Sequence, residues 1–194
     1  RQRQMCIRDR LRREGAEVVA LSVKDSNKRA LDFYLRNGYA LRGVILIMRG
    51  PVEALPEGAE PGFAVERRRA AELPGRKFRP SAWWGTLTEP VDRLVYRRYP
   101  AEEAVLAYRG RRLRGVAEFS ADSELYVDYM ALSTYSAAGA LRTLLYGLRL
   151  AAAEAGARSV TIPVDASKRL LVEQLLECGL RTAETEYLAA KDLA

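Results

Sequence analysis

Two polar side chains in the first quarter of the chain could do chemistry on a substrate, Tyr34 and, seven residues before it, Asn27. Tyr34 can act as a general acid, because its hydroxyl donates one hydrogen bond and keeps its proton at neutral pH. Asn27 offers both a donor and an acceptor to a ligand that is rich in amides. The alternatives are that Tyr34 is a half-buried core aromatic and that Asn27 is a plain helix cap.

The stretch of residues 18–50 predicts the strand, helix and strand that would position these two side chains. Residues 18–23 form a short apolar, mostly β-branched run, which is typical of a strand buried on both faces. Asn27 can cap the helix that follows, and Gly38 is a usual C-terminal stop. Residues 44–48 predict the next strand. One apolar stripe of the helix comprises Ala30, Leu31, Tyr34 and Leu35.

At these positions the chain resembles the GCN5-related N-acetyltransferase (GNAT) family. The family pattern is a strand L-x-V, a loop with Asn, a helix A-x-x-F/Y-Y, the pair G-F/Y and a strand. It is matched here by Leu21-Ser22-Val23, Asn27, Ala30, Phe33-Tyr34 and Gly38-Tyr39. The resemblance implies acetyl transfer from acetyl-CoA to an amine by direct attack. It also implies that Tyr34 protonates the departing thiolate and that Asn27 contacts the pantetheine arm of the cofactor.

The sequence contains an internal repeat, because residues 156–194 align with residues 15–53 at a constant offset of 141 without a gap. Gly15 thereby corresponds to Gly156, and the same offset holds for every other matched position. A period of this size is one domain length rather than a solenoid unit. The repeat therefore predicts two tandem copies of one domain.

The predicted domain organisation follows from the repeat. Residues 1–50 are expected to be the C-terminal remnant of a first acetyltransferase domain. Residues 51–62 have the Pro- and Gly-rich composition of a linker, and residues 63–194 are expected to form a second, degenerate acetyltransferase-like domain. Residues 1–14 lack an initiator Met and are unusually rich in Arg, so we expect a truncated or artefactual start; whether residues 1–10 are native is left open.

The second copy departs from the family at the positions where chemistry would occur. The family places the cofactor pyrophosphate on a loop Q/R-x-x-G-x-G/A at a helix start, where free backbone N–H groups attract anions. The equivalent loop begins with Ser136, keeps Gly139 and closes with Leu141. Ser136 and Gly139 are therefore the candidate cofactor contacts in this copy.

The position of Tyr34 corresponds to Leu175 in the second copy, and that of Asn27 corresponds to Lys168. A leucine cannot protonate a leaving group. We therefore assign catalysis to the first copy, and we expect the second copy to be a structural or substrate-covering partner.

The rest of the chain predicts further strands and one long helix. Strands are expected at residues 63–69, 104–108, 113–120 and 125–132, with hairpin turns at 110–112 and 121–123, and a helix is expected at 138–155. Residues 79–99, which include Trp83 and Trp84, look irregular. The predicted fold class is α/β, a GNAT-type mixed, mostly antiparallel sheet flanked by helices.

Composition excludes several classes of protein. The chain contains no histidine, which excludes Ser-His and Cys-His catalysis and histidine-based metal sites. Its two cysteines lack metal spacing and indicate a reducing, cytoplasmic compartment. No apolar run approaches the roughly 18 residues of a membrane span. The net charge of +7 is compatible with a phosphate-bearing ligand.

The sequence thus predicts a cytoplasmic acetyl-CoA-dependent N-acetyltransferase that acts on a small-molecule or protein amine, without metal, membrane or nucleic acid as a partner. One alternative is a non-catalytic binding or dimerisation module of degenerate acetyltransferase fold, and a homodimer stays open. A third interpretation is a basic RNA-associated domain, since arginine runs could bind phosphates. The acceptor amine and the general base are not determined by these residues.

Overall fold

A computed structural model of the chain describes residues 15–73, 83–85 and 101–193. These residues form nine strands and three α-helices. The first repeat unit contains β1 (Val18–Lys24), α2 (Lys28–Arg36) and β2 (Ala40–Pro51), and the short 3-10 helix η1 (Val52–Ala54) follows it. The middle of the chain contains β3 (Phe63–Arg69), η2 (Ala70–Glu72), β4 (Trp83–Gly85), β5 (Glu103–Arg109), β6 (Arg112–Ala121), β7 (Leu125–Ser133) and α4 (Ala137–Ala155). The second repeat unit contains β8 (Ser159–Asp165), α5 (Arg169–Glu177) and β9 (Arg181–Asp192).

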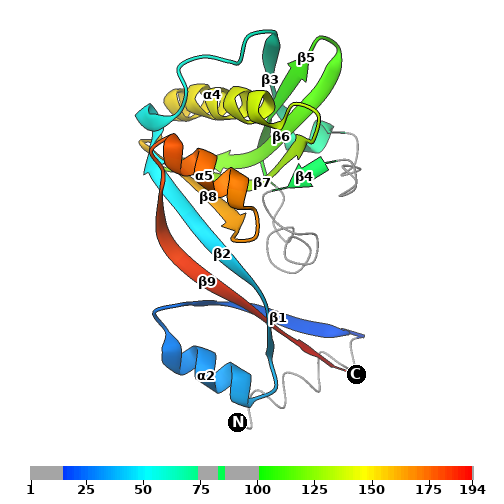
Figure 1. The fold of residues 1–194 in the computed structure, drawn as a ribbon, viewed down its shortest axis with the longest axis vertical. Coiled ribbons are helices and arrows are strands. Elements are labelled where there is room, and N and C mark those ends of the chain that lie inside the picture. Colours follow the sequence, from blue (N-terminus) through cyan, green and yellow to red (C-terminus); the bar gives the residue numbers. More distant parts are fainter. Residues whose placement is uncertain (1–14, 74–82, 86–100, 194) are drawn as a thin grey trace.

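The strands form one mixed sheet in the order β1-β9-β2-β8-β7-β6-β5-β3, with β4 paired to β7 off this path. Every pair is antiparallel except β7 with β8. Figure 1 shows two lobes. The upper lobe contains β3 to β8, α4 and α5, and the lower lobe contains β1, α2 and the far ends of β2 and β9. The two long strands β2 and β9 run through both lobes and join them. The fold class that the sequence predicts is thereby confirmed.

The two repeat units correspond element by element. The bounds of β1, α2 and β2, shifted by 141 positions, coincide with those of β8, α5 and β9. The units exchange their last strands: β9 lies between β1 and β2, and β2 lies between β8 and β9. Each repeat unit is therefore completed by the final strand of the other unit.

The exchange is symmetric down to the residue register. The pair Val18–Asp192 of β1 and β9 becomes, under the same shift, the pair Ser159–Pro51 of β8 and β2. The β2–β9 pairing carries one bulge at each end, where Arg42 and its counterpart Ala183 are skipped. Two backbone bonds outside the strands follow the same rule, Leu193 N to Glu17 O and Val52 N to Arg158 O. The pairing of the two copies therefore has twofold symmetry.

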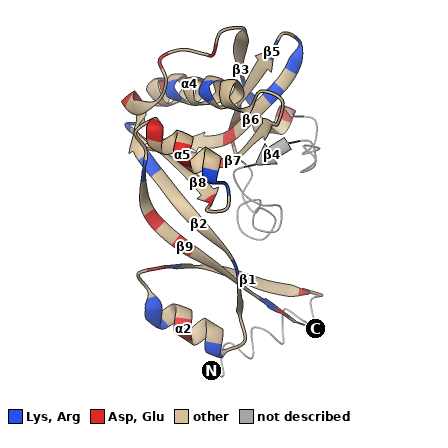
Figure 2. Cartoon of the chain, viewed as in Figure 1, with Lys and Arg blue, Asp and Glu red and all other residues tan. Residues whose placement is uncertain are grey.

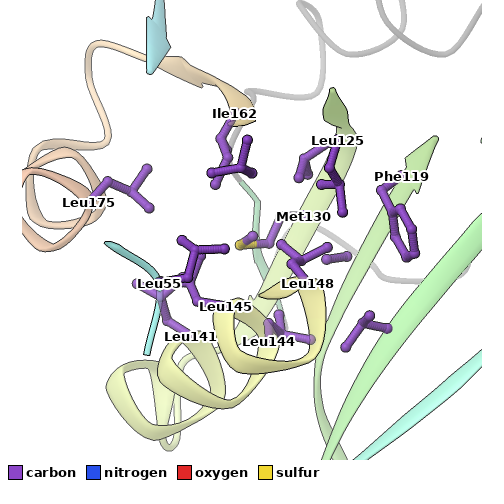
Figure 3. Packing of buried hydrophobic residues seen from close by; sticks show 14 of the residues in the cluster. Leu55, Phe119, Leu125, Met130, Leu141, Leu144, Leu145, Leu148, Ile162 and Leu175 are labelled. Carbon is purple, nitrogen blue, oxygen red and sulfur yellow. The ribbon is translucent and has the colours of Figure 1, made fainter. Parts of the chain in front are cut away.

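The upper lobe has a large apolar core between α4, α5 and the sheet (Figure 3). In the close view Leu175 of α5 and Ile162 of β8 lie across from Leu141 and Leu145 of α4. Glycine is needed where α4 approaches the sheet, because a Cβ on Gly147 would meet side chains of β3 and β5. The other face of these strands carries a smaller cluster formed by Ala104, Leu106, Val116 and Ala131.

Three sequence-based expectations differ from the structure. β1 is an edge strand in which only Val23 is buried, so the prediction of a strand covered on both faces is wrong for the described residues. Residues 83–85, expected to be irregular, form β4 because they pair with the end of β7; most of the rest of 79–99 lies outside the described residues. In the Pro- and Gly-rich segment, Val52 and Leu55 are buried in the upper core, so this stretch is packed rather than a free spacer.

Candidate functional site

Helix α2 carries the two residues that the sequence proposes for catalysis and cofactor contact. Asn27 is its N-cap, and the Asn27 Oδ1 accepts a hydrogen bond from the Ala30 amide at 3.1 Å. This satisfies one of the free N–H groups of the first turn. The cap occupies Oδ1, so a ligand of this residue would use the amide Nδ2 as its donor.

Tyr34 is half-buried on α2 and packs edge-on against two aromatic rings. Its ring centroid is 5.5 Å from that of Phe33 and 5.3 Å from that of Tyr39, which is buried. The C-terminal end of the helix is held by the other repeat unit, because the Lys191 ammonium group on β9 donates to the Asn37 carbonyl. A cation at this end also complements the helix dipole. The exchanged strand thus fixes the helix that carries Tyr34.

The two residues proposed for cofactor binding in the second copy lie at the start of α4. Ser136 is the N-cap residue and has a φ of 148°, which is unusual for a residue with a side chain. Its Oγ lies 3.5 Å from the Arg109 Nη1. Gly139 faces the protein interior: a Cβ there would lie 2.8 Å from the Phe63 ring and 3.0 Å from the Glu60 Cγ. Gly139 is therefore explained by packing against β3 and the segment before it.

The sheet of the upper lobe opens between β7 and β8. These parallel strands pair only at Leu125–Val160 and Tyr126–Thr161 and then separate. One edge of β7 is paired with β6 along its length. The other edge, beyond Tyr126, is paired with β4 at residues 131–133. An extended ligand with amide groups could bind such an edge as an added strand, but β4 already fills the end of it.

Apolar side chains of α5 fill the position that corresponds to Tyr34. Leu175 has 0% exposure and belongs to the same cluster as Leu141 and Leu145 of α4. Figure 3 shows it pointing from α5 into that cluster. The upper lobe therefore has no proton donor at this position, and its residues do not fit the thioester end of acetyl-CoA.

The structure does not bring the four candidate residues into one site. Tyr34 and Asn27 are on α2 in the lower lobe, whereas Ser136 and Gly139 are at the start of α4 in the upper lobe (Figure 1). This division is expected if the two pairs belong to different copies of a repeated domain. Within the described residues no group of His, Cys, Asp and Glu could hold a metal ion.

Two arginines of the runs that could bind phosphates form ion pairs within the fold. Arg67 pairs with Glu103 and Glu154, and Arg68 pairs with Glu66 at 2.6 Å. Figure 2 shows acidic and basic positions interspersed over both lobes, with basic residues gathered at the β5–β6 hairpin. No described helix is long and apolar enough to cross a membrane.

The structure buries a central-strand carboxylate for which the sequence favoured a solvent-facing position. Glu118 on β6 is only 5% exposed, although charge on a central strand favours a solvent-facing position. Its pairing with Tyr129 of β7 places it in the middle of the sheet. Asp128, the other carboxylate of the central strands, accepts a hydrogen bond from the Ser120 hydroxyl at 3.3 Å.

Comparison with known proteins identifies the fold. No family model and no curated protein matches the sequence. Solved structures do match. They include a GCN5-related N-acetyltransferase from Kribbella flavida, with 16% identity, a TM-score of 0.63, and coverage of 95% of this chain and 72% of that one. Another comes from Sphaerobacter thermophilus, with 15% identity, a TM-score of 0.59, and coverage of 91% of this chain and 60% of that one.

A further match is a tandem GNAT protein from the clavulanic acid biosynthesis pathway, with 12% identity, a TM-score of 0.58, and coverage of 96% of this chain and 67% of that one. The chain spans only 60% of the Sphaerobacter structure. At these identities the likeness concerns the fold. The fold of this chain is that of GCN5-related N-acetyltransferases, an acyltransferase-type fold whose members generally use acetyl-CoA.

Proposed function

We propose that this chain is part of a tandem acetyl-CoA-dependent N-acetyltransferase in which the copy that carries Tyr34 performs the chemistry. The upper lobe would then be its non-catalytic partner. The observation that supports this is the contrast between equivalent positions of the two repeat units. Tyr34 presents a half-buried phenol on α2, whereas Leu175 on α5 is fully buried in the core.

The chemistry needs one proton donor at the sulfur. Bound acetyl-CoA supplies a thioester, and the neutral acceptor amine forms the new C–N bond as the C–S bond breaks. The Tyr34 hydroxyl can give its proton to the thiolate, because a phenol O–H is a hydrogen-bond donor that can serve as a general acid. The amine nitrogen releases its proton to solvent, and solvent returns a proton to the Tyr34 oxygen. Asn27 can donate from Nδ2 to a carbonyl of the pantetheine arm while its Oδ1 caps α2.

The upper lobe is proposed to be a scaffold because two features oppose cofactor binding there. β4 is paired to the end of the β7 edge next to the opening between β7 and β8. The Phe63 ring lies against Gly139, near the helix start where a pyrophosphate would need the backbone. A second candidate function, a purely non-catalytic binding module, is favoured by the same two features if the lower copy also lacks activity.

The experiment measures acetyl transfer and acetyl-CoA binding with the full-length protein. We expect Tyr34→Phe to lower kcat by about 100-fold or more, the range for loss of a general acid, and to leave the Kd for acetyl-CoA unchanged. Tyr135→Phe is the matched control, since Tyr135 is an exposed tyrosine beside the start of α4 in the upper lobe. An unchanged kcat in Tyr34→Phe would contradict the proposed role of Tyr34. If calorimetry detects no heat of binding for acetyl-CoA, the non-catalytic module is favoured.

A further inference from the structure

Strand β9 of the second copy holds the loop that leads into α2. The Asp25 amide donates to the Thr185 carbonyl at 2.9 Å. The Lys24 ammonium group pairs with the Glu184 carboxylate at 2.9 Å. Figure 1 shows β9 running from the upper lobe into the lower lobe, where β1 and α2 lie. The last strand of the second copy therefore contacts the first copy at the start of the helix that carries the tyrosine.

The same strand holds the C-terminal end of α2 through Lys191. Its Nζ donates to the Asn37 carbonyl, and a cation at this end of a helix also complements the helix dipole. The next residue, Gly38, turns the chain with a left-handed φ of 79°. A Cβ on Gly38 would lie 2.9 Å from the Lys191 Nζ. The turn after α2 is thus packed against Lys191 as well as bonded to it.

The turn that Lys191 contacts is bonded directly to Tyr34. The Tyr34 carbonyl accepts from the Asn37 amide at 3.0 Å and from the Tyr39 amide at 3.1 Å. The Tyr39 ring packs edge-on against the Tyr34 ring, with centroids 5.3 Å apart. The Asn37 Nδ2 also donates to the Phe33 carbonyl at 2.7 Å. A shift of Asn37 would therefore move the backbone of Tyr34 and the ring beside it together.

The strand exchange is symmetric, but these side-chain contacts are not. The backbone bond before α2 recurs before α5, where the Ala166 amide donates to the Val44 carbonyl at 2.9 Å. The positions on β2 that correspond to Glu184 and Lys191 are both glycine. Because glycine has no side chain, β2 offers neither contact to α5. The exchanged strand therefore provides both side-chain contacts to the copy that has the tyrosine and neither of them to the other copy.

The two helices are anchored in different ways. α5 is anchored by Leu171 and Leu175, which lie in the large core cluster. The corresponding residues of α2, Ala30 and Tyr34, belong to none of the clusters that the described residues form. A tyrosine that must reach a thioester cannot be packed into a core, so its helix needs another anchor. The contacts of β9 at the two ends of α2 provide it.

We propose that Lys191 is a positioning residue for Tyr34. By fixing the C-terminal end of α2 through Asn37, it holds the phenol hydroxyl where the departing thiolate forms. This inference rests on the proposed function and gives the second copy a part in it, because Lys191 comes from the final strand of the copy that lacks the tyrosine.

Steady-state kinetics of the full-length protein test this role. Lys191→Met keeps an unbranched side chain of similar length and removes the donor, and we expect it to lower kcat by about 10- to 100-fold. The KM for acetyl-CoA should stay unchanged, because the Asn27 end of α2 keeps its own contacts with β9. Lys191→Arg retains a cation with N–H donors and should restore most of the kcat. An unchanged kcat in Lys191→Met, or an equal loss in both variants, would overturn the proposal.

Arg181→Met is the matched control. Arg181 also lies on β9, and its guanidinium group donates to the carbonyls of Leu176 and Leu180 at the end of α5. It therefore makes the same kind of contact with the helix of the copy that lacks the tyrosine. We expect this variant to leave kcat unchanged, and a loss as large as that of Lys191→Met would overturn the proposal.

Amide hydrogen exchange of the full-length protein separates this proposal from the proposed function. In Lys191→Met the amides of Asn37 and Tyr39 should exchange faster, while residues 159–165 of β8 should exchange as in the unaltered protein. Unchanged exchange of the two amides, or faster exchange of β8 as well, would overturn the local role of Lys191. Absence of acetyl transfer in the unaltered protein would instead reject the proposed function, and with it the role of Lys191 in catalysis.

Discussion

Ile45 of β2 and Glu186 of β9 lie opposite each other, and they occupy the same position in the two repeat units. This pair is the only described β2–β9 pair that the 141-residue shift maps onto itself, so it marks the centre of the exchange. The two strands are central to the contacts of both lobes, because β9 pairs with β1 on one side and β2 pairs with β8 on the other. The lobes therefore share their connecting strands and should unfold together.

Truncation of Ile45 should destabilise both lobes at once. Its side chain is 1% exposed and packs with Leu188 of the exchanged strand. We expect Ile45→Ala to lower the free energy of unfolding by about 2–5 kcal/mol. When denaturant unfolding is monitored through the hydrogen exchange of β1 and of β6, the denaturant midpoints of the two strands should shift by the same amount. Leu170→Ala, at a 68% exposed position, is the control and should change stability by no more than about 0.5 kcal/mol; separate midpoints for the two strands would contradict the shared-strand argument.

The reciprocal substitutions Leu175→Tyr and Tyr34→Leu should lower the free energy of unfolding by unequal amounts. We expect Leu175→Tyr to cost about 1–3 kcal/mol of stability, because the larger side chain and its hydroxyl must enter a filled core. Tyr34→Leu should cost about 1 kcal/mol or less, since Tyr34 is only half-buried. Thermal or chemical unfolding of both variants checks this order. Equal costs would show that the two positions are more alike than the structure indicates.

Gly147 should not tolerate a side chain, although alanine is the better helix former by about 1 kcal/mol. A Cβ there would contact Val105 and would lie 2.6 Å from the Val65 Cγ2. We expect Gly147→Ala to lower the free energy of unfolding by about 1–3 kcal/mol. The control is Gly58→Ala, where nothing lies within 4 Å of the added atom. If steric contact is the cause, adding Val65→Ala should cost less in the Gly147→Ala background than in the unaltered chain.

The ion pair of Glu103 and Arg67 should contribute a small pH-dependent stability. The hydrogen bond from Arg67 holds the pKa of the Glu103 carboxyl below its ordinary value of 4.5. Its contribution is therefore fully present above the unfolded-state pKa and is lost as the pH falls through the lowered folded-state pKa. Both side chains are about a third exposed, so we expect Glu103→Gln to cost about 0.2–1 kcal/mol at pH 7.

The measurement is denaturant unfolding at a series of pH values. The difference between Glu103→Gln and the unaltered chain should shrink towards zero in acid. Glu57→Gln, at a side chain that is 87% exposed and whose contact with Arg149 is 3.4 Å long, should show a smaller trend. A difference for Glu103→Gln that is independent of pH would mean that the stability comes from packing rather than from the charge of Glu103.

The local elements of the fold could be predicted from the sequence, because each is encoded by neighbouring residues. The expected strand at 63–69 has the bounds of β3, and the expected helix at 138–155 differs from α4 by one residue. Asn27 caps α2 as its side-chain chemistry predicts. The repeat itself was visible because the two units keep the same spacing without a gap.

The pairing of the strands was decided only by the tertiary structure. The two repeat units have nearly the same apolar pattern, so each final strand fits beside either copy of the preceding strand, and no local signal selects the exchanged arrangement. The exposure of Val18 follows from the edge position of β1, and the burial of Leu175 follows from its packing against α4, neither of which is set by their neighbours in the chain. The sequence by itself determined which elements form and that they form twice. The tertiary structure determined that each copy is closed by the other's last strand, because non-local pairing depends on which surfaces meet in space.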